Sequence, residues 1–118
     1  MNVKNSKGGL VLKKSSSREQ IEIDYGVLRR AVLTLRAINH AMRKQMILMM
    51  EEKQKLTVTE IYTKLNIEQS VASQHLALMR RAGVVVTQRQ GKFIFYSVNN
   101  KRLGTINKLI QDLAQPIE

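Results

Sequence analysis

Neutral hydrogen-bonding side chains are concentrated in one stretch of the chain, residues 68–82. Apolar residues recur there at helical spacing, with Ala72, Leu76 and Met79 on one side. The amide and hydroxyl groups on the other side can donate and accept hydrogen bonds, which suits base edges and phosphate oxygens. The stretch therefore carries the chemistry of nucleic-acid contact. The side chains expected on this outer surface are Gln69, Ser70, Ser73 and Gln74, followed by His75.

Basic and hydroxyl side chains lie at the end of this stretch and on both sides of it in the sequence. Arg80 is near its end, and Arg89 and Lys92 follow in a segment with a different pattern. Their positive charges are suited to phosphate contacts. Thr57 and Thr59 come at the expected start of another helix, where a hydroxyl can hydrogen-bond to phosphate. These five residues complete the predicted set of DNA contacts.

Catalytic and metal-binding chemistry has no comparable set of residues. The chain has no cysteine, which excludes disulfides, thiolate metal sites and a cysteine nucleophile. Its two histidines, His40 and His75, are not at metal-ligand spacing, and no serine and carboxylate pattern accompanies them. Gly8 and Gly9 alone do not make a phosphate loop, because no Gly-Lys-Ser/Thr follows a strand there. We expect no enzymatic activity, no cofactor and no bound metal.

The overall charge points to the same class of partner. The 118 residues contain 20 Lys and Arg against 9 Asp and Glu, which gives a formal net charge of +11. Such an excess favours nucleic acid or an anionic surface, and the partner we predict is double-stranded DNA. No segment approaches the roughly 20 apolar residues that cross a bilayer, and no signal-type apolar run follows the N-terminus. We therefore expect a cytoplasmic protein that does not contact membranes.

The chain divides into a short N-terminal segment and one domain. Residues 1–18 hold only basic charges, together with glycines and serines, and cannot bury enough apolar surface to offset the entropy of ordering. We predict a flexible basic arm over residues 1–20 and a single folded domain over residues 21–118. The arm either lies along DNA or is an unconstrained tail, and the sequence favours neither.

Two helices are predicted at the start of the domain. The first begins after Asp24, whose carboxylate can cap it. Asn39 marks either a turn or the cap of a second helix, which is rich in methionine on its apolar side. Arg43 and Lys44 are expected to open the polar face of that second helix.

The next two helices are short and closely linked. Thr57 or Thr59 caps the third helix, and Asn66 is a turn residue after it. The fourth helix occupies residues 68–82, and Gly83 terminates it. Two such helices with a short link are typical of a helix-turn-helix.

Beyond Gly83 the period of the pattern changes from helical to alternating. Residues 84–89 predict a strand, Gln90-Gly91 a turn and residues 92–98 the return strand. A last helix begins near Lys101 and is ended by Pro116.

The predicted fold class is mainly α with a β hairpin, a winged helix-turn-helix. In such a fold the recognition helix, residues 68–82, fits the major groove of DNA. The wing, residues 84–98, reaches the neighbouring backbone or the minor groove.

Three segments match the motifs of one known family. Residues 70–85, SVASQHLALMRRAGVV, resemble its recognition-helix pattern S-x-H-L-x-x-L-R-x-A-G-L-V. Residues 91–98, GKFIFYSV, resemble its wing pattern G-R-x-x-Y-Y-S-L, and residues 41–48, AMRKQMIL, resemble D-P-T-R-L-R-I-L without the Asp-Pro. From about Leu35 to Leu103, the chain therefore resembles the ArsR/SmtB family of bacterial winged-helix repressors.

This resemblance implies a homodimer formed by the first and last helices. Two recognition helices would then read a palindromic operator, and the protein would be a repressor. The alternative is that the same apolar stripes pack only within one chain. The residues predicted at the dimer interface are Val27, Leu28, Leu35, Leu103, Ile106, Ile110 and Leu113.

The chain departs from the family at the residues that sense metals. Many members carry a cysteine pair where this chain has Thr57 and Thr59, and hydroxyls are poor ligands for soft metals. Other members bind zinc between the last helices through paired His and Asp ligands, but no histidine follows His75 here. The resemblance thus implies DNA binding without thiolate metal sensing. It leaves open whether a small-molecule effector exists.

Two further classes of function stay open on the sequence alone. A non-specific architectural nucleic-acid-binding protein would rely on the basic arm and the net charge. A winged helix can also serve as an RNA-binding or protein-interaction module.

Overall fold

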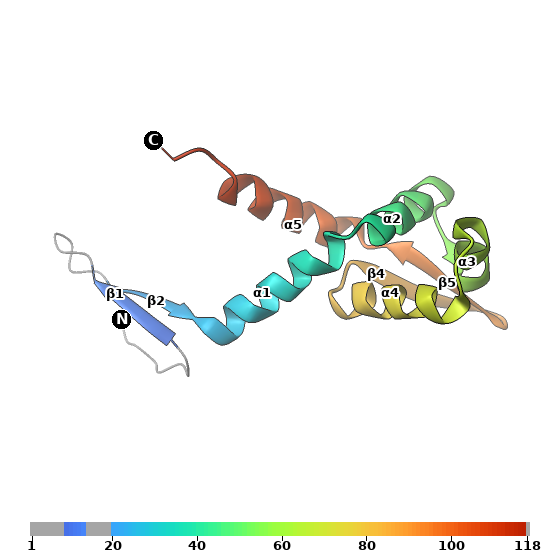
Figure 1. Cartoon of the computed structure of the whole chain (residues 1–118), viewed down its shortest axis with the longest axis horizontal. Coiled ribbons are helices and arrows are strands. Elements are labelled where there is room, and N and C mark those ends of the chain that lie inside the picture. Colours follow the sequence, from blue (N-terminus) through green and yellow to red (C-terminus); the bar gives the residue numbers. More distant parts are fainter. Residues whose placement is uncertain (1–8, 14–19, 118) are drawn as a thin grey trace. The chain divides into compact units, whose positions relative to one another are not determined.

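The structure, a computed structural model, describes residues 9–13 and 20–117. The chain separates into two units, residues 1–34 and 35–118, and each is described by itself. Helix α1 (Tyr25–Ile38) runs across the boundary between them. Figure 1 labels most of the helices and strands along the chain.

In the first unit, a two-stranded antiparallel sheet precedes α1. Strand β1 (Gly9–Lys13) pairs with β2 (Gln20–Asp24), with Gly9 opposite Asp24. The Asp24 Oδ1 atom accepts hydrogen bonds from the backbone N–H groups of Gly26 (2.9 Å) and Val27 (3.3 Å), which confirms the predicted cap. The strands were not predicted, because glycine, serine and charge outweighed the short apolar alternation of these segments. The rest of the predicted flexible arm lies outside the described residues.

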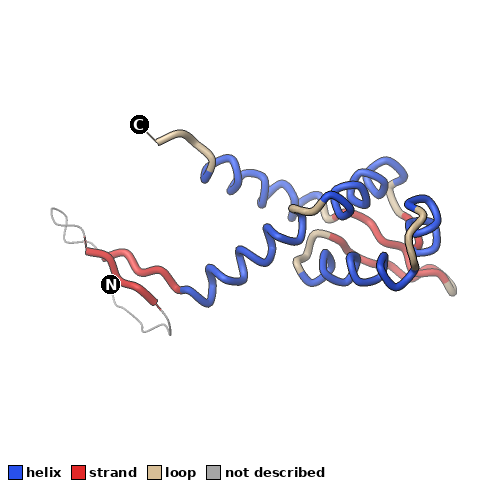
Figure 2. The backbone as a smooth tube through the Cα atoms, in the orientation of Figure 1, coloured by secondary structure: helices blue, strands red, loops and turns tan. Residues whose placement is uncertain are grey.

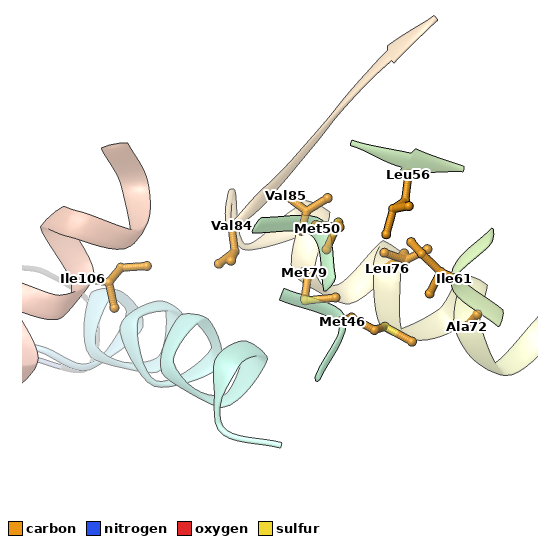
Figure 3. Close-up of a cluster of buried hydrophobic side chains, with 10 residues drawn as sticks. All are labelled: Met46, Met50, Leu56, Ile61, Ala72, Leu76, Met79, Val84, Val85 and Ile106. Carbon is orange, nitrogen blue, oxygen red and sulfur yellow. The ribbon is translucent and has the colours of Figure 1, made fainter. Parts of the chain in front are cut away.

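The second unit is built around a core that four helices and a sheet share. Helices α2 (Ala41–Lys53), α3 (Val58–Leu65), α4 (Gln69–Arg81) and α5 (Asn100–Leu113) surround it. Two of its members are methionines of α2, as the sequence predicted. Figure 3 shows the cluster, which consists of Met46, Met50, Leu56, Ile61, Ala72, Leu76, Met79, Val84, Val85 and Ile106.

Side chains at the helix ends fix where these helices start and stop. His40, not Asn39, caps α2, and its Nδ1 accepts a hydrogen bond from Met42 N at 3.1 Å. Thr57 and Glu60 form a reciprocal capping box at the start of α3. Asn66 ends α3 with a left-handed backbone (φ 58°), which asparagine tolerates better than most residues. The α3–α4 connection is therefore short and well defined, as a helix-turn-helix requires.

A three-stranded antiparallel sheet completes the second unit. Strands β4 (Val85–Gln90) and β5 (Phe93–Val98) form the hairpin, and the unpredicted β3 (Leu56–Thr57) pairs with β5. The turn consists of Gly91 and Lys92, one residue later than predicted, and Gly91 has φ 65°. A positive φ at the first turn residue is the pattern of a type II′ hairpin. The hairpin extends away from α5, and its turn lies at the far end (Figure 2).

Two side-chain hydrogen bonds join the residues that follow α4 to the start of α5. Asn99 caps α5 by accepting from Arg102 N at 3.1 Å, and its Nδ2 donates to Gly83 O at 3.1 Å. The Nε of Arg102 donates to Ala82 O at 3.3 Å. Gly83 has φ 78°, a backbone that favours glycine, and a Cβ there would lie 3.3 Å from Arg102 Nε. The base of the hairpin is therefore held between two helices.

The order of helices and the hairpin confirms the predicted fold class, a winged helix-turn-helix. Among the described residues, no helix combines the length and the apolar character needed to span a membrane.

Candidate nucleic-acid interface

Helix α4 has one buried side and one exposed polar side. Ala72, Leu76 and Met79 are fully buried. At 3.6 residues per turn, the four predicted polar residues spread over an arc of about 140° that begins beside the buried stripe and extends away from it. All four are exposed, as predicted. We call Gln69, Ser70, Ser73 and Gln74 the polar arc.

Basic side chains are exposed at the end of α4 and near the tip of the hairpin. Arg80 and its neighbour Arg81 are both exposed in the last turn of α4. Arg89 and Lys92 are exposed near the tip of the hairpin. From residue 69 to residue 111 the sequence contains no Asp or Glu. The recognition helix and the hairpin therefore lie in a continuous acid-free stretch of the chain.

A lysine outside the predicted set lies against the hairpin. The Nζ of Lys55 donates to Gln90 Oε1 at 3.0 Å and lies 4.6 Å from the centroid of the Phe95 ring. At the tip, the Nζ of Lys92 lies 5.8 Å from the centroid of the Phe93 ring. At exposed sites, cation–π contacts of this kind contribute only a modest stabilising energy. No sequence signal indicated Lys55, because its partners lie far along the chain.

The two threonines predicted as phosphate contacts differ in their surroundings. The Thr57 Oγ1 accepts from Glu60 N and donates to Glu60 Oε1, both at 3.2 Å. Its hydroxyl is thus already used in the capping box. Thr59 is exposed in the first turn of α3. The structure brings neither residue into the polar arc.

His75 also lies apart from the polar arc. It is half-buried, about 100° around the helix from Gln74. Its Nδ1 is 3.1 Å from Arg43 Nη1, and its ring centroid is 4.9 Å from that of His40. Burial, followed by the charges of Arg43 and His40, lowers the pKa of His75 below its usual value. A role in base contact stays a prediction for this residue.

Arg43 is the residue whose position the sequence analysis got wrong. It was expected on the polar face of α2, yet it is only 9% exposed. Its Nε donates to Ala37 O at 2.8 Å and its Nη2 donates to Arg36 O at 3.0 Å. These carbonyls belong to the last turn of α1, where the backbone oxygens carry partial negative charge, and Arg36 O also accepts from Asn39 N at 3.2 Å. The hydrogen bonds to these two carbonyls therefore offset the loss of hydration of the buried guanidinium.

The residues predicted at a dimer interface fall into two groups. Ile106 is buried in the core of its own chain, and Leu35, Leu103 and Ile110 pack partly against that core. Val27, Leu28 and Leu113 are exposed, Leu113 at 78%. Helical spacing identified the apolar residues but not which of them the chain itself covers. Further exposed apolar side chains on the same two helices are Val32, Leu33 and Leu109.

The structure offers no metal centre in the part of the chain that it describes. No group of three or more His, Cys, Asp or Glu side chains there could hold an ion. Thr57 and Thr59 occupy the positions at which the resemblance implies a cysteine pair.

Comparison with known sequences identifies relatives of this chain. Residues 42–87 match the family model described as "Bacterial regulatory protein, arsR family". The transcriptional repressor PagR of Bacillus anthracis is 35% identical over 92 residues, which cover 78% of this chain and 92% of PagR. The transcriptional activator HlyU of Vibrio cholerae is 32% identical over 84 residues, which cover 71% of this chain and 77% of HlyU.

The solved structures similar to this chain include those of the same two relatives. The crystal structure of PagR is 37% identical with a TM-score of 0.58 and covers 72% of this chain and 98% of its own. The structure of HlyU from Vibrio cholerae is 31% identical with a TM-score of 0.57, and the match covers 75% of this chain and 97% of HlyU. The fold is also shared with a homodimeric winged helix-turn-helix DNA-binding domain from Mycobacterium bovis, which is 20% identical. The TM-score is 0.61, and the match covers 76% of this chain and 82% of that domain.

Proposed function

Since the chain belongs to the arsR family of bacterial regulatory proteins, it is a DNA-binding transcriptional regulator, and we propose that it acts as a homodimeric repressor on a palindromic operator. The chain lacks the cysteine metal site of the family, so its regulation does not depend on thiolate metal sensing. The observation that carries the proposal is the polar arc of α4, exposed within an acid-free stretch.

The polar arc is assigned to base edges in the major groove. All four of its residues lie in the first half of α4, the part of a recognition helix that reaches base edges. Gln74 is suited to adenine, because its amide can donate and accept at the same time. Ser70 and Ser73 can bond to either bases or phosphates.

The hairpin and the end of α4 are assigned to the phosphate backbone. Arg80, Arg89 and Lys92 are exposed cations, and phosphate contacts of this type give affinity without sequence preference. Thr59 is offered to a phosphate near the start of α3. Thr57 would have to share its hydroxyl with Glu60.

The homodimer is supported by exposed apolar side chains on α1 and α5, taken separately. Val27 and Leu28 of α1 and Leu109 and Leu113 of α5 are open to solvent in a single chain. Clustered apolar residues on a surface mark interaction sites. A two-fold dimer would place two recognition helices about 34–36 Å apart, on half-sites one turn of DNA apart. Repression is supported by PagR, although HlyU is named an activator.

Fluorescence anisotropy tests the proposal directly. The full chain would be titrated into duplex DNA from the region upstream of its own gene and into a scrambled duplex, near physiological salt. We expect the first to bind at least ~10³-fold more tightly, as sequence-specific regulators do. Equal binding with a steep salt dependence would overturn it in favour of a non-specific architectural protein.

Deletion of residues 1–18 separates the same two functions. A cytoplasmic repressor that binds a specific operator should keep its ratio of operator affinity to scrambled-duplex affinity without these residues. An architectural protein that relies on them loses most of its affinity for every duplex. Absence of duplex binding even at low salt would instead favour an RNA-binding or protein-interaction module.

A further inference from the structure

Arg43 joins three parts of the second unit. It is the one charged side chain that is buried among the described residues. Its guanidinium is bonded to the last turn of α1 through Ala37 O and Arg36 O, and to α4 through His75 Nδ1. A planar guanidinium offers five N–H donors in a fixed arrangement, so one side chain can hold all three acceptors at once.

The contact with Arg43 decides which tautomer His75 adopts. A guanidinium has only donors, so the Nδ1 atom of His75 must be the acceptor. An imidazole whose Nδ1 accepts a hydrogen bond is neutral and carries its proton on Nε2. The half-buried ring therefore retains one donor, Nε2–H, and no positive charge.

We propose that Arg43 is a positioning residue for DNA recognition, which holds His75 as a neutral Nε2–H donor toward an acceptor atom of the operator. This inference rests on the proposed function, because it needs α4 to be the recognition helix. The acceptor is either a base atom such as guanine N7 or O6 or a phosphate oxygen, and both have the same chemistry toward an N–H group.

The charges around His75 also favour its neutral form. Arg43 of α2 and His40 at the start of α2 both face the ring and disfavour a second positive charge. Partial burial adds to their effect, and together they lower the pKa of His75. The neutral form should therefore persist at neutral pH, where the tautomer matters.

Nuclear magnetic resonance of the full chain tests the first half of the proposal without DNA. Long-range ¹H–¹⁵N correlation spectra distinguish Nδ1–H, Nε2–H and doubly protonated imidazole. We expect His75 in the Nε2–H form at pH 7. The variant Arg43→Lys lacks the planar fork, so the tautomer should no longer be fixed, whereas the matched control Arg36→Lys, an exposed arginine of α1, should leave it unchanged. An Nδ1–H or charged His75 in the unmodified protein would overturn the proposal.

A double-mutant cycle tests the second half. Arg43→Lys should weaken operator binding about tenfold, the loss expected for one hydrogen bond to DNA. The same change in a His75→Phe background should then have little further effect. An equal loss in both backgrounds, with thermal melting showing both variants folded, would mean that Arg43 supports only the fold and would overturn the proposal.

The two possible acceptors give different outcomes in this cycle. A loss confined to the operator identifies a base, and an equal loss on the scrambled duplex identifies a phosphate. A protein with no operator preference at all would instead contradict the proposed function, and the tautomer measured without DNA would still stand.

Discussion

Gln74 and Lys92 are both exposed, but they are assigned to different parts of DNA. A bidentate amide contact to adenine discriminates between bases, so Gln74→Ala should reduce the preference for the operator by ~1–3 kcal/mol. Gln45→Ala, on an exposed position of α2, is the matched control. The ratio of operator to scrambled affinity, measured by anisotropy, checks this, and an unchanged ratio would remove Gln74 from base contact.

Lys92 at the turn of the hairpin should act on all DNA alike. Removing one phosphate contact lowers the salt slope of log affinity by about one. Lys92→Ala should therefore weaken operator and scrambled DNA equally, while Lys44→Ala on α2 should change neither. If the slope for Lys92→Ala equals that of the unmodified protein, the hairpin does not contact phosphate.

His75 makes the stability of the folded chain depend on pH. Burial, Arg43 and His40 lower its pKa in the folded state, so the unfolded chain binds the proton more readily. Stability should therefore fall as the pH drops through about 6.5 toward the lower folded value, and the dependence should end below it. Urea unfolding between pH 7.5 and pH 5 measures this. His75→Phe should flatten the curve over that window, and an unaltered curve would contradict the assignment.

At the scale of elements, the capping box determines where α3 begins. Thr57 accepts from Glu60 N, and its own N–H donates to Glu60 Oε1 at 2.8 Å. Thr57→Ala removes one of these partners and should cost ~1 kcal/mol of unfolding free energy. Thr59→Ala, inside the same helix, is the control with no cap to lose. Equal midpoints and slopes in urea for the two variants would contradict the cap.

Local patterns allowed most elements to be predicted, and distant contacts account for the rest. Asp24, Thr57 and Asn66 act on backbone groups within a few residues of themselves, so their roles follow from sequence. Strand β3 forms only because β5, far along the chain, lies beside it. Arg43 looked like a surface residue because its acceptors depend on how α1 ends and where α4 packs. The polar arc followed from spacing, whereas the position of Lys55 did not.

At the scale of the whole molecule, the exposed apolar residues of α5 give the clearest test of assembly. We expect a dimer by sedimentation equilibrium at micromolar concentration. Leu113→Glu places a charge on a side chain that is 78% exposed in one chain, so it should dissociate the dimer without unfolding the monomer. Leu48→Glu is the control, since Leu48 is 68% exposed but lies on α2.

Operator affinity should fall with the dimer, because each monomer reads only one half-site. A Leu113→Glu protein that remains dimeric would exclude this part of α5 from the interface. Ile106 is not suited to the same test, because it is buried in its own chain and a charge there would unfold it.

The hydrogen bonds of Asn99 and Arg102 have a mechanical consequence for such an assembly. They fasten the first turn of α5 to the last residues after α4, so the two helices turn together rather than independently. A rotation of one α5 relative to the α5 of the second copy would therefore also tilt α4, the recognition helix, of the same chain. A signal that loosens the protein from its operator therefore needs no ligand near the DNA; a change in how two last helices meet is sufficient.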